Sequence, residues 1–185
     1  FSLSGAAQDL MVRRREIILH LPMEPVDSNV NAGKNPVTTE TSSEEIGKIL
    51  DSAINSLPGI VGVNNHMGSK ATADQETMQK LMAELKKRDL FFLDSRTTRS
   101  SVAEQEAQNG NIPYLFNWTF LDQGESSEQE VQRLLGQLVR AARRNGMVVG
   151  ICHPHANTVA VLKKEIPDLV NSGIRFVTLS EMFAL

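Results

Sequence analysis

The chain has 185 residues and a mass of 20.4 kDa, which fits one domain with a core of ordinary size. Its 19 lysines and arginines nearly balance its 22 aspartates and glutamates, and the formal net charge of −3 argues against a nucleic-acid partner. A hydrophobic fraction of 41% excludes wholesale disorder, and no apolar run approaches the roughly 20 residues of a membrane span. The single cysteine, Cys152, excludes an internal disulfide framework and a cysteine-based zinc site. We therefore expect one domain over residues 1–185.

The start of the chain predicts a helix, a strand and a long loop. Residues 6–14 have the spacing of an amphipathic helix, and residues 16–20 are typical of a short buried strand. Residues 21–39 contain three prolines among Asp and Asn residues, which predicts a loop. Loops of this length are usually functional or mobile, so this one is a candidate substrate rim.

A second helix is expected to start near residue 42. Thr41 with Glu44 and Ser42 with Glu45 both fit a capping box, and the pattern leaves the choice open. Apolar residues then recur at helical spacing until the Pro-Gly pair at 58–59 ends the helix.

The middle of the chain alternates between strands and helices. Strands are expected at 60–63 and 90–93, and a polar loop at 64–73 follows the first of them. Asp74 is expected to cap a helix whose apolar stripe is Met78, Leu81, Met82 and Leu85. A further helix is expected at 101–109.

The last part of the chain continues the alternation. An extended segment is expected at 114–116 and 120–121. The next helix is expected to start with a capping box of Ser127 and Glu130 and to end at Gly146. A strand at 147–152, helix or turn at 158–162 and 166–171, and a final strand at 174–179 complete the expected elements. Strands that alternate with helices predict an α/β domain in which helices cover a parallel sheet. In such folds the chemistry lies at the carboxyl ends of the strands.

All four histidines fall at the carboxyl ends of expected strands. They are His20, His66, His153 and His155. A single strand-end histidine is more often a hydrogen-bonded structural group than a ligand, but four of them favour a metal site or an acid–base site. His153 and His155 flank Pro154, so they either share one side of an extended segment or form a simple turn.

Two aspartates near strand ends have both a structural and a functional interpretation. Asp94 follows a buried strand and is typical of a turn anchor, with Arg96 as its ion-pair partner. Asp122 precedes Gly124 and is more typical of a turn than of a catalyst. Both are also candidates for the site itself, because they lie at the same expected sheet edge as the histidines.

Five stretches, in order along the chain, carry a family pattern. They are Glu-Ile-Ile-Leu-His-Leu-Pro-Met-Glu-Pro at 16–25, Gly-Val-Asn-Asn-His-Met-Gly-Ser at 62–69, Phe-Leu-Asp-Ser at 92–95, Phe-Leu-Asp at 120–122 and Gly-Ile-Cys-His-Pro-His-Ala-Asn-Thr at 150–158. Together they resemble the divergent polysaccharide deacetylase family. The first two stretches are the most specific, and the resemblance runs from about residue 15 to the C-terminus.

The resemblance implies a fold and a metal. The fold is a distorted (β/α) barrel of parallel strands with covering helices, related to carbohydrate deacetylases. In that group an Asp and two His hold a divalent metal, usually zinc, and a second Asp serves as the base. His20 and His66 match the two metal-ligand histidines.

The resemblance also implies roles for other residues. Asp94 matches the late strand-end Asp that supports the catalytic site, and His153 or His155 would be the general acid. We assign Asn65, Arg96 and Asp122 to binding of the substrate, an acetylated polysaccharide or another carbohydrate.

The sequence departs from the family pattern before His20. The family carries an Asp-Asp pair well upstream of the His-Leu-Pro-Met stretch, whereas Asp9 is the single acidic residue before Glu16. We expect that the chain lacks the first strands of the barrel, because a natural barrel without them would expose sheet edges.

Three functions are open from the sequence. The first is a bacterial, metal-dependent hydrolase that removes acetyl groups from a cell-envelope polysaccharide in the periplasm or outside the cell. The alternative is a non-catalytic envelope protein that binds glycan or a cell-wall partner through a relic deacetylase barrel, which the missing Asp pair favours. A cytoplasmic metal-dependent hydrolase of a small molecule is the third. The four strand-end histidines favour an enzyme.

Overall fold

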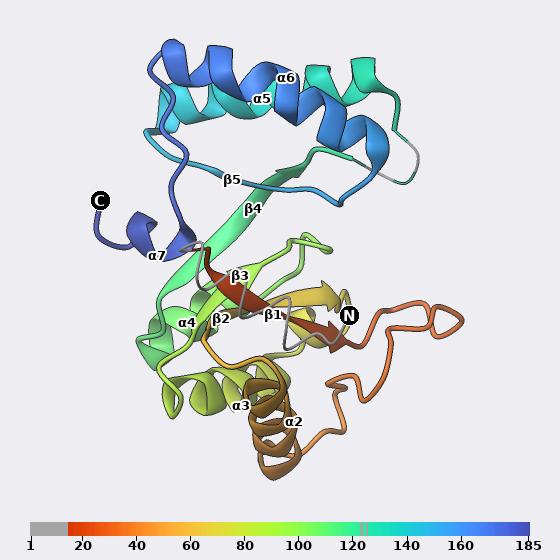
Figure 1. Ribbon diagram of the computed structural model, residues 1–185. Coiled ribbons are helices and arrows are strands. Elements are labelled where there is room, and N and C mark those ends of the chain that lie inside the picture. Colours follow the sequence, from red (N-terminus) through yellow and green to blue (C-terminus); the bar gives the residue numbers. More distant parts are fainter. Residues whose placement is uncertain (1–14, 123, 125) are drawn as a thin grey trace. The chain divides into compact units, whose positions relative to one another are not determined.

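The computed structural model of the protein describes residues 15–122, 124 and 126–185. The helix expected at residues 6–14 lies outside the described residues. The described elements are β1 (Ile17–Met23), α2 (Ser43–Ser56), β2 (Ile60–Met67), η1 (Ala71–Ala73), α3 (Gln75–Lys86), β3 (Phe91–Asp94), α4 (Ala103–Gly110), β4 (Tyr114–Phe120), α5 (Glu128–Asn145), β5 (Val149–Ile151), α6 (Ala156–Asn171) and α7 (Leu179–Met182). Strands and helices alternate along the chain, which confirms the expected α/β class (Figure 1). None of the helices among these residues combines the length and the apolar character of a membrane span.

The five strands form a parallel sheet in the order β1-β2-β3-β4-β5. Each strand is therefore the neighbour of the next strand along the chain, which is the winding of a (β/α) barrel. Between the described residues of β1 and β5 there is no ladder, so the sheet is open. The expected parallel sheet with covering helices is confirmed, and these five strands do not close it into a barrel.

The chain divides into two compact units within β4. The first unit ends at Phe116 and the second begins at Asn117. Residues 114–116 pair with β3 in the first unit, and residues 117–120 pair with β5 in the second. The expectation of one domain over residues 1–185 stays a prediction.

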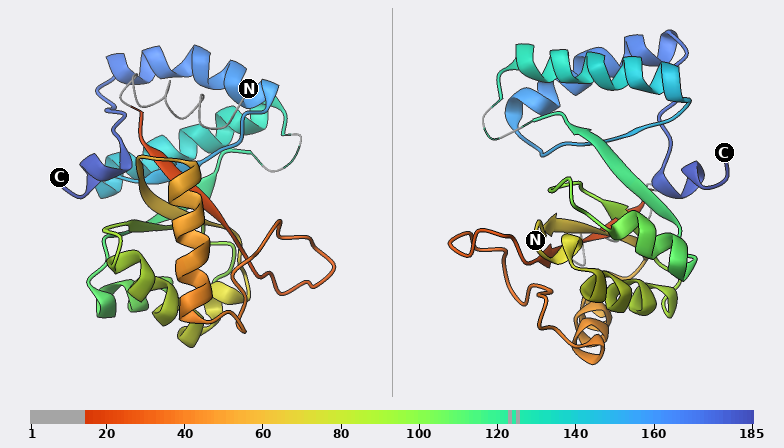
Figure 2. Two further views of the ribbon diagram at one scale, coloured as in Figure 1. Left: turned by 60° about the horizontal axis from the view of Figure 1, so that its bottom comes forward. Right: turned by 180° about the vertical axis from the view of Figure 1, so that it is seen from behind.

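The core of the first unit lies between its strands and its helices. Helices α2, α3 and α4 lie on the same side of β1, β2 and β3 (Figure 1, Figure 2). Alternate strand residues face these helices and are buried: Leu21, Met23, Val63 and Phe92. The apolar stripe at residues 78–85 of α3 is buried against them, as the spacing predicted. The residues that alternate with them, such as His20 and Asn64, point to the opposite face of the sheet.

The helix starts of the first unit follow local sequence signals. Ser42 caps α2: its hydroxyl accepts the Glu45 N–H at 3.3 Å, and the Glu45 carboxylate accepts the Ser42 N–H at 2.9 Å. Of the two candidate capping boxes, the structure therefore contains the second. Asp74 caps α3 as expected and accepts the Thr77 N–H at 2.8 Å. Each cap satisfies an N–H that has no partner within its helix.

Two strands run further than the sequence pattern indicated. β1 continues to Met23 and β2 to Met67, so the loops expected from residues 21 and 64 begin later, at residues 24 and 68. The loop was expected from residue 64 because residues 64–66 are polar and interrupt the apolar pattern of the strand. Their side chains nevertheless find hydrogen-bond partners, and buried polar groups with partners are compatible with a strand.

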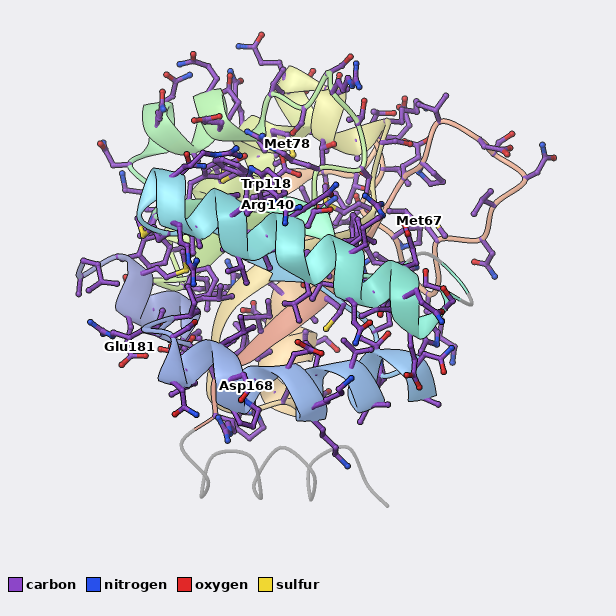
Figure 3. All side chains as sticks on the ribbon, turned by 90° about the horizontal axis from the view of Figure 1, so that it is seen from above. Met67, Met78, Trp118, Arg140, Asp168 and Glu181 are labelled. Carbon is purple, nitrogen blue, oxygen red and sulfur yellow. The ribbon has the colours of Figure 1, made fainter. Side chains whose placement is uncertain are left out.

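In the second unit, α5 and α6 lie side by side and form a second core together with Leu121 (Figure 2, Figure 3). Figure 3 marks the two helices by Arg140 of α5 and Asp168 of α6. Gln132 of α5 donates a hydrogen bond to Glu165 of α6 at 3.1 Å. This helix pair covers β5, which follows α5 directly.

The ends of α5 were predicted in part. Ser127 caps the helix and accepts the Glu130 N–H at 3.2 Å. The Glu130 carboxylate, however, binds Arg133 at 2.7 Å, so the reciprocal half of the expected capping box is absent. Gly146 ends the helix as expected, with a positive φ of 85° that favours glycine.

The helix predicted near the C-terminus was confirmed, and the final strand was wrong. Residues 158–162 and 166–171 belong to one continuous helix, α6, which tolerates Pro167 near its end at the loss of one hydrogen bond. The strand expected at 174–179 is absent, because these residues form no ladder with a described strand. Instead, Thr178 and Glu181 form a capping box that starts α7. An apolar run alone does not make a strand when no neighbouring strand pairs with it.

Candidate functional site

His20 of β1 and His66 of β2 meet on the sheet face opposite the helices of the first unit. His20 pairs with Asn64 in the parallel ladder, and His66 lies two residues further along β2, so all three side chains point to the same face. The Nε2 atom of His20 lies 3.0 Å from the Nδ1 atom of His66. The rings meet edge to face, with centroids 4.8 Å apart.

This histidine pair fits a divalent metal. Two imidazole nitrogens that bind one tetrahedral zinc ion lie about 3.3 Å from each other, close to the distance found here. The other ring nitrogen of His20, Nδ1, lies 3.1 Å from Asn64 Oδ1. Metal-binding histidines almost always make such a second hydrogen bond, which fixes the ring. The assignment of His20 and His66 as ligands remains a prediction that this donor set supports.

Asn65 is fully buried and uses its amide within the protein. Its Nδ2 atom donates to the Met67 carbonyl at 2.7 Å, and its Oδ1 atom accepts the Ser95 N–H at 2.7 Å. Thr97 donates to the same Met67 carbonyl at 2.9 Å. Met67 has a positive φ of 54°, which is uncommon for a residue other than glycine. Asn65 therefore supports the turn that follows His66, and its expected contact with substrate stays a prediction.

Asp94 is buried on the other side of the sheet from His20. It lies two residues after Phe92, whose ring is in the helix-facing core, and successive strand residues alternate between faces. Its carboxylate accepts hydrogen bonds from Ser101 at 2.7 Å and from Tyr114 at 3.3 Å. Burial and then the charge of Asp94 raise the pKa of Tyr114, which keeps this hydroxyl a donor. These contacts favour a structural role, and the catalytic role of Asp94 stays a prediction.

Arg96 is not the ion-pair partner of Asp94 that the sequence suggested. Its backbone N–H donates to the Asp94 carboxylate at 2.7 Å, whereas its guanidinium pairs with Glu104 at 3.6 Å. The guanidinium also lies 3.5 Å from the centroid of the Phe116 ring, in a cation–π contact. The side chain is 44% exposed, so it remains available to a ligand.

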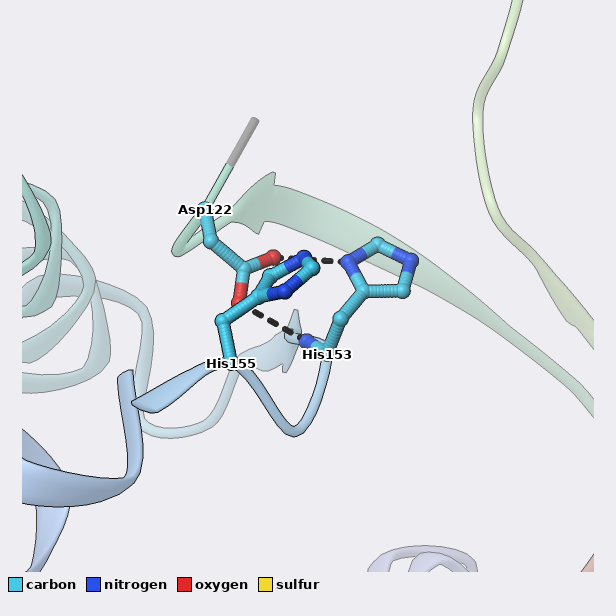
Figure 4. A group of neighbouring side chains, drawn as sticks. All are labelled: Asp122, His153 and His155. Carbon is cyan, nitrogen blue, oxygen red and sulfur yellow. Dashed lines mark hydrogen bonds and ion pairs between the residues drawn. The ribbon is translucent and has the colours of Figure 1, made fainter. Parts of the chain in front are cut away.

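The second candidate group lies at the carboxyl ends of β4 and β5. Asp122 and His153 each lie two residues beyond a paired position of the two strands, Phe120 and Ile151. The His153 Nδ1 atom lies 2.7 Å from Asp122 Oδ1, and the His153 N–H donates to Asp122 Oδ2 at 2.8 Å (Figure 4). Thr158 donates a third hydrogen bond to the carboxylate at 2.8 Å. Asp122, expected to contact substrate, therefore orients His153.

The electrostatics of this pair keep Asp122 ionised. Burial alone would raise the pKa of the Asp122 carboxyl, but the hydrogen bonds from the main chain and ring of His153 and from Thr158 outweigh it, so the net shift is downward. The Asp122 side chain has no exposed area, while half of the His153 side chain is exposed. The buried Asp122 carboxylate thus holds the accessible His153 ring through Nδ1. The other ring nitrogen, Nε2, is the one that can transfer a proton to or from a ligand.

Asp122, His153 and His155 also form a possible metal site. One ligand atom from each residue lies within 4.8 Å of the other two. The two rings have centroids 5.7 Å apart. The short Asp122–His153 contact has the geometry of a charge-assisted hydrogen bond, so the group suits acid–base chemistry as well as a metal.

Three residues that form hydrogen bonds with candidate residues had no predicted role: Asn64, Ser95 and Thr158. All three lie within the family stretches, at 62–69, 92–95 and 150–158. Their place in these stretches was the one feature of the sequence that could have indicated a role at the site. Their partners became clear only from the strand register and the loop geometry.

The long loop after β1 forms a pocket in the first unit. The pocket has a volume of about 660 Å³ and is lined by loop residues together with Lys70. Glu24 closes one side: its carboxylate binds Lys70 at 2.7 Å and accepts the Thr39 N–H at 2.9 Å. The interpretation of this loop as a substrate rim stays a prediction. The pocket shows that the loop has a concave surface.

Residues 2–183 match the family described as divergent polysaccharide deacetylase. The chain belongs to this family. The match covers both units and every candidate residue described above. The family fits a carbohydrate deacetylase-like fold, and it agrees with the resemblance found in the five sequence stretches.

Relatives of this deacetylase-family chain come from bacteria. The uncharacterized protein YibQ of Escherichia coli is 40% identical over 154 residues, which cover 83% of this chain and 48% of YibQ. An uncharacterized protein of Haemophilus influenzae is 37% identical over 163 residues, covering 88% of this chain and 57% of that protein. The chain thus spans about half the length of these two relatives. A crystal structure of an uncharacterized protein from Agrobacterium tumefaciens has a TM-score of 0.88 at 28% identity, covering 98% of this chain and 74% of that one.

Proposed function

We propose that the chain belongs to a metal-dependent hydrolase that removes acetyl groups from a cell-envelope polysaccharide or a related carbohydrate outside the cytoplasm. The observation that carries the proposal is the His20–His66 pair, whose facing nitrogens lie 3.0 Å apart in a member of the divergent polysaccharide deacetylase family. The family supports a carbohydrate substrate. The extracytoplasmic location is part of the proposal and follows from the family resemblance.

His20 and His66 are the proposed metal ligands of this chain. A divalent metal, with zinc as our choice, supplies Lewis-acid polarisation of the acetyl carbonyl and lowers the pKa of a bound water toward about 7. His20 offers Nε2 and His66 offers Nδ1. The carboxylate ligand and the base that the family pattern implies upstream of His20 are assigned to no residue of this chain.

His153 is the proposed general acid. Hydrolysis adds water oxygen to the acetyl carbonyl carbon and breaks the bond from that carbon to the sugar nitrogen or oxygen, which releases acetate. The departing sugar atom needs a proton, and His153 can give one from Nε2 while Nδ1 stays bound to Asp122. The buried Asp122 carboxylate stabilises the positive charge of the ring before the transfer. This contact favours His153 over His155 for the role.

The proposal is tested with the full-length natural protein, loaded with zinc and offered a panel of N- and O-acetylated glycans. Released acetate is measured for the wild type, for His153→Ala and for the double variant His20→Ala, His66→Ala. We expect acetate from the wild type and a loss of at least about 100-fold in both variants. If the metal-loaded wild type releases acetate from none of the glycans, the proposal is wrong.

The same panel separates the other two functions. Glycan binding that survives both His66→Ala and chelation, without acetate release, indicates a non-catalytic binding protein. Acetate release from small acetylated compounds but from no polymer indicates a small-molecule hydrolase.

A further inference from the structure

A chain of hydrogen bonds leads from the loop after β3 to the ring of His20. The Ser95 hydroxyl donates to the Asn65 main-chain carbonyl at 2.7 Å. A carbonyl oxygen can only accept, so the hydroxyl proton is committed to that bond. Ser95 Oγ therefore accepts its second hydrogen bond, which comes from Asn64 at 3.1 Å.

The donor role of Asn64 toward Ser95 determines how its amide is oriented. The atom that faces Ser95 must be Nδ2, because Oδ1 has no proton to give. Oδ1 then faces the other way, toward His20 Nδ1 at 3.1 Å. Asn64 is 6% exposed and Ser95 is 2% exposed, so water competes little for these bonds. The amide is thus held in one of its two possible orientations.

The orientation of Asn64 in turn selects one tautomer of His20. An oxygen next to Nδ1 requires the proton on Nδ1. Neutral His20 then carries its lone pair on Nε2, the nitrogen that points at His66 Nδ1. The opposite tautomer would place a proton where a metal must bind and would set a lone pair against the Asn64 oxygen.

We infer that Asn64, oriented by Ser95, is a positioning residue that holds His20 with its proton on Nδ1 and its lone pair on Nε2. The inference deepens the proposed function, since this is the tautomer in which His20 can bind a metal together with His66. Asn64 and Asn65 are successive strand residues, so their side chains act on opposite faces of the sheet. Asn64 serves the histidine face, while Asn65 holds the turn after His66.

The tautomer is measured directly in the metal-free full-length chain. Long-range ¹H–¹⁵N NMR spectra of the histidine rings, recorded where His20 is neutral, distinguish a protonated Nδ1 from a protonated Nε2. The variants are Asn64→Leu, which removes the acceptor at similar size, Asn64→Asp, which keeps an acceptor in both orientations, and Ser95→Ala, which removes the group that orients the amide. His20 is assigned by its loss in His20→Ala.

We expect the Nδ1–H tautomer of His20 in the wild type and in Asn64→Asp. In Asn64→Leu the Nε2–H form should gain population, and Ser95→Ala should show a smaller change in the same direction. Backbone amide spectra check that the leucine and aspartate variants keep the same fold. If the role of Asn64 were purely structural, the two variants would show the same His20 tautomer. The inference is overturned if the wild type has the Nε2–H tautomer, or if Asn64→Leu keeps Nδ1–H.

Zinc affinity gives the second readout. In competition with a chromophoric chelator, Asn64→Leu should bind zinc about 10- to 100-fold more weakly than the wild type, and Asn64→Asp should restore most of the affinity. Equal zinc affinity of all three proteins overturns the link to the metal. If the wild type binds no zinc but shows the expected tautomers, the proposed function fails while the positioning of His20 by Asn64 stands.

Discussion

The Nε2 atom of His20 lies 3.0 Å from the Nδ1 atom of His66, although the two residues are 46 positions apart in the sequence. The parallel register of β1 and β2 creates this contact, because it pairs His20 with Asn64 and sets His66 on the same face. A one-residue slip of either strand would turn its histidine toward the helices. The pair is therefore a direct product of the strand register.

The Asp122–His153 contact predicts a variant with normal metal content and low activity. Asp122→Asn replaces a carboxylate that accepts three hydrogen bonds by an amide that must turn a donor toward one of them. His153 then loses its fixed orientation and its counter-charge. We expect acetate release to fall by about 100-fold or more with the metal content unchanged.

The matched control is Asp168→Asn, which removes an exposed carboxylate from α6 of the same unit. Its activity should equal that of the wild type. Full activity of Asp122→Asn would remove His153 from the proposed mechanism.

The lowered pKa of Asp122 predicts how stability depends on pH. Because the folded-state pKa lies below the ordinary value, the ionised carboxylate stabilises the fold above about pH 4, and this contribution is lost as the pH falls through the folded-state pKa. At pH 7, Asp122→Ala should lower the free energy of unfolding by about 2 kcal/mol, since it leaves buried donors without an acceptor.

Urea unfolding of the wild type and Asp122→Ala between pH 3 and pH 7 tests this expectation. The difference between the two should shrink below about pH 4. Asp168→Ala should show little difference from the wild type at any pH. A difference that stays constant into acid would mean that the Asp122 charge does not contribute to stability.

A buried ion pair in the first unit predicts a large effect on stability. Arg88 binds Glu84 at 2.7 Å and Asp51 at 2.8 Å, and the Arg88 and Glu84 side chains are 15% and 6% exposed. Arg88→Met removes the charge at similar size and leaves Glu84 buried with less compensation. We expect a loss of about 3 kcal/mol in the free energy of unfolding.

The control for Arg88 is Lys48→Met. Lys48 pairs with Glu44 on the exposed side of α2, and both side chains are largely exposed. Such pairs contribute about 0.5 kcal/mol or less. Thermal or urea unfolding that shows equal small losses for both variants would contradict the assigned role of Arg88.

The alternation of strands and helices was predictable from sequence because each element carries a local signal. Capping by Ser42 and Asp74 and the buried stripe of α3 need only the neighbouring residues, and all were confirmed. The segment at 174–179 shows the limit of this reasoning. Its apolar run fits a buried strand, but pairing depends on residues far away in the sequence, and the local capping box starts a helix instead.

The site was predictable as a set of residue types and not as a set of contacts. The prediction that the histidines lie at strand ends was correct for His66, near the end of β2, and for His153 and His155, just beyond β5. It was wrong for His20, which lies in the middle of β1 because that strand continues to Met23. Residues 64–66 were interpreted as loop because they are polar. Without the strand, the opposite directions of Asn64 and Asn65 could not be predicted. β3 is buried on both faces, so its apolar pattern could not show that Asp94 lies on the helix-facing side.

The central claim is that His20 and His66 hold a metal, and metal content tests it most directly. Elemental mass spectrometry is applied to the purified full-length wild type, to the double variant His20→Ala, His66→Ala and to the matched double variant His153→Ala, His155→Ala. We predict near-stoichiometric zinc or another divalent metal in the wild type and in the His153, His155 variant, and none in the His20, His66 variant. Absence of metal from the zinc-loaded wild type would contradict the account. So would metal that survives loss of His20 and His66 but disappears with His153 and His155, since the ion would then belong to the Asp122 group.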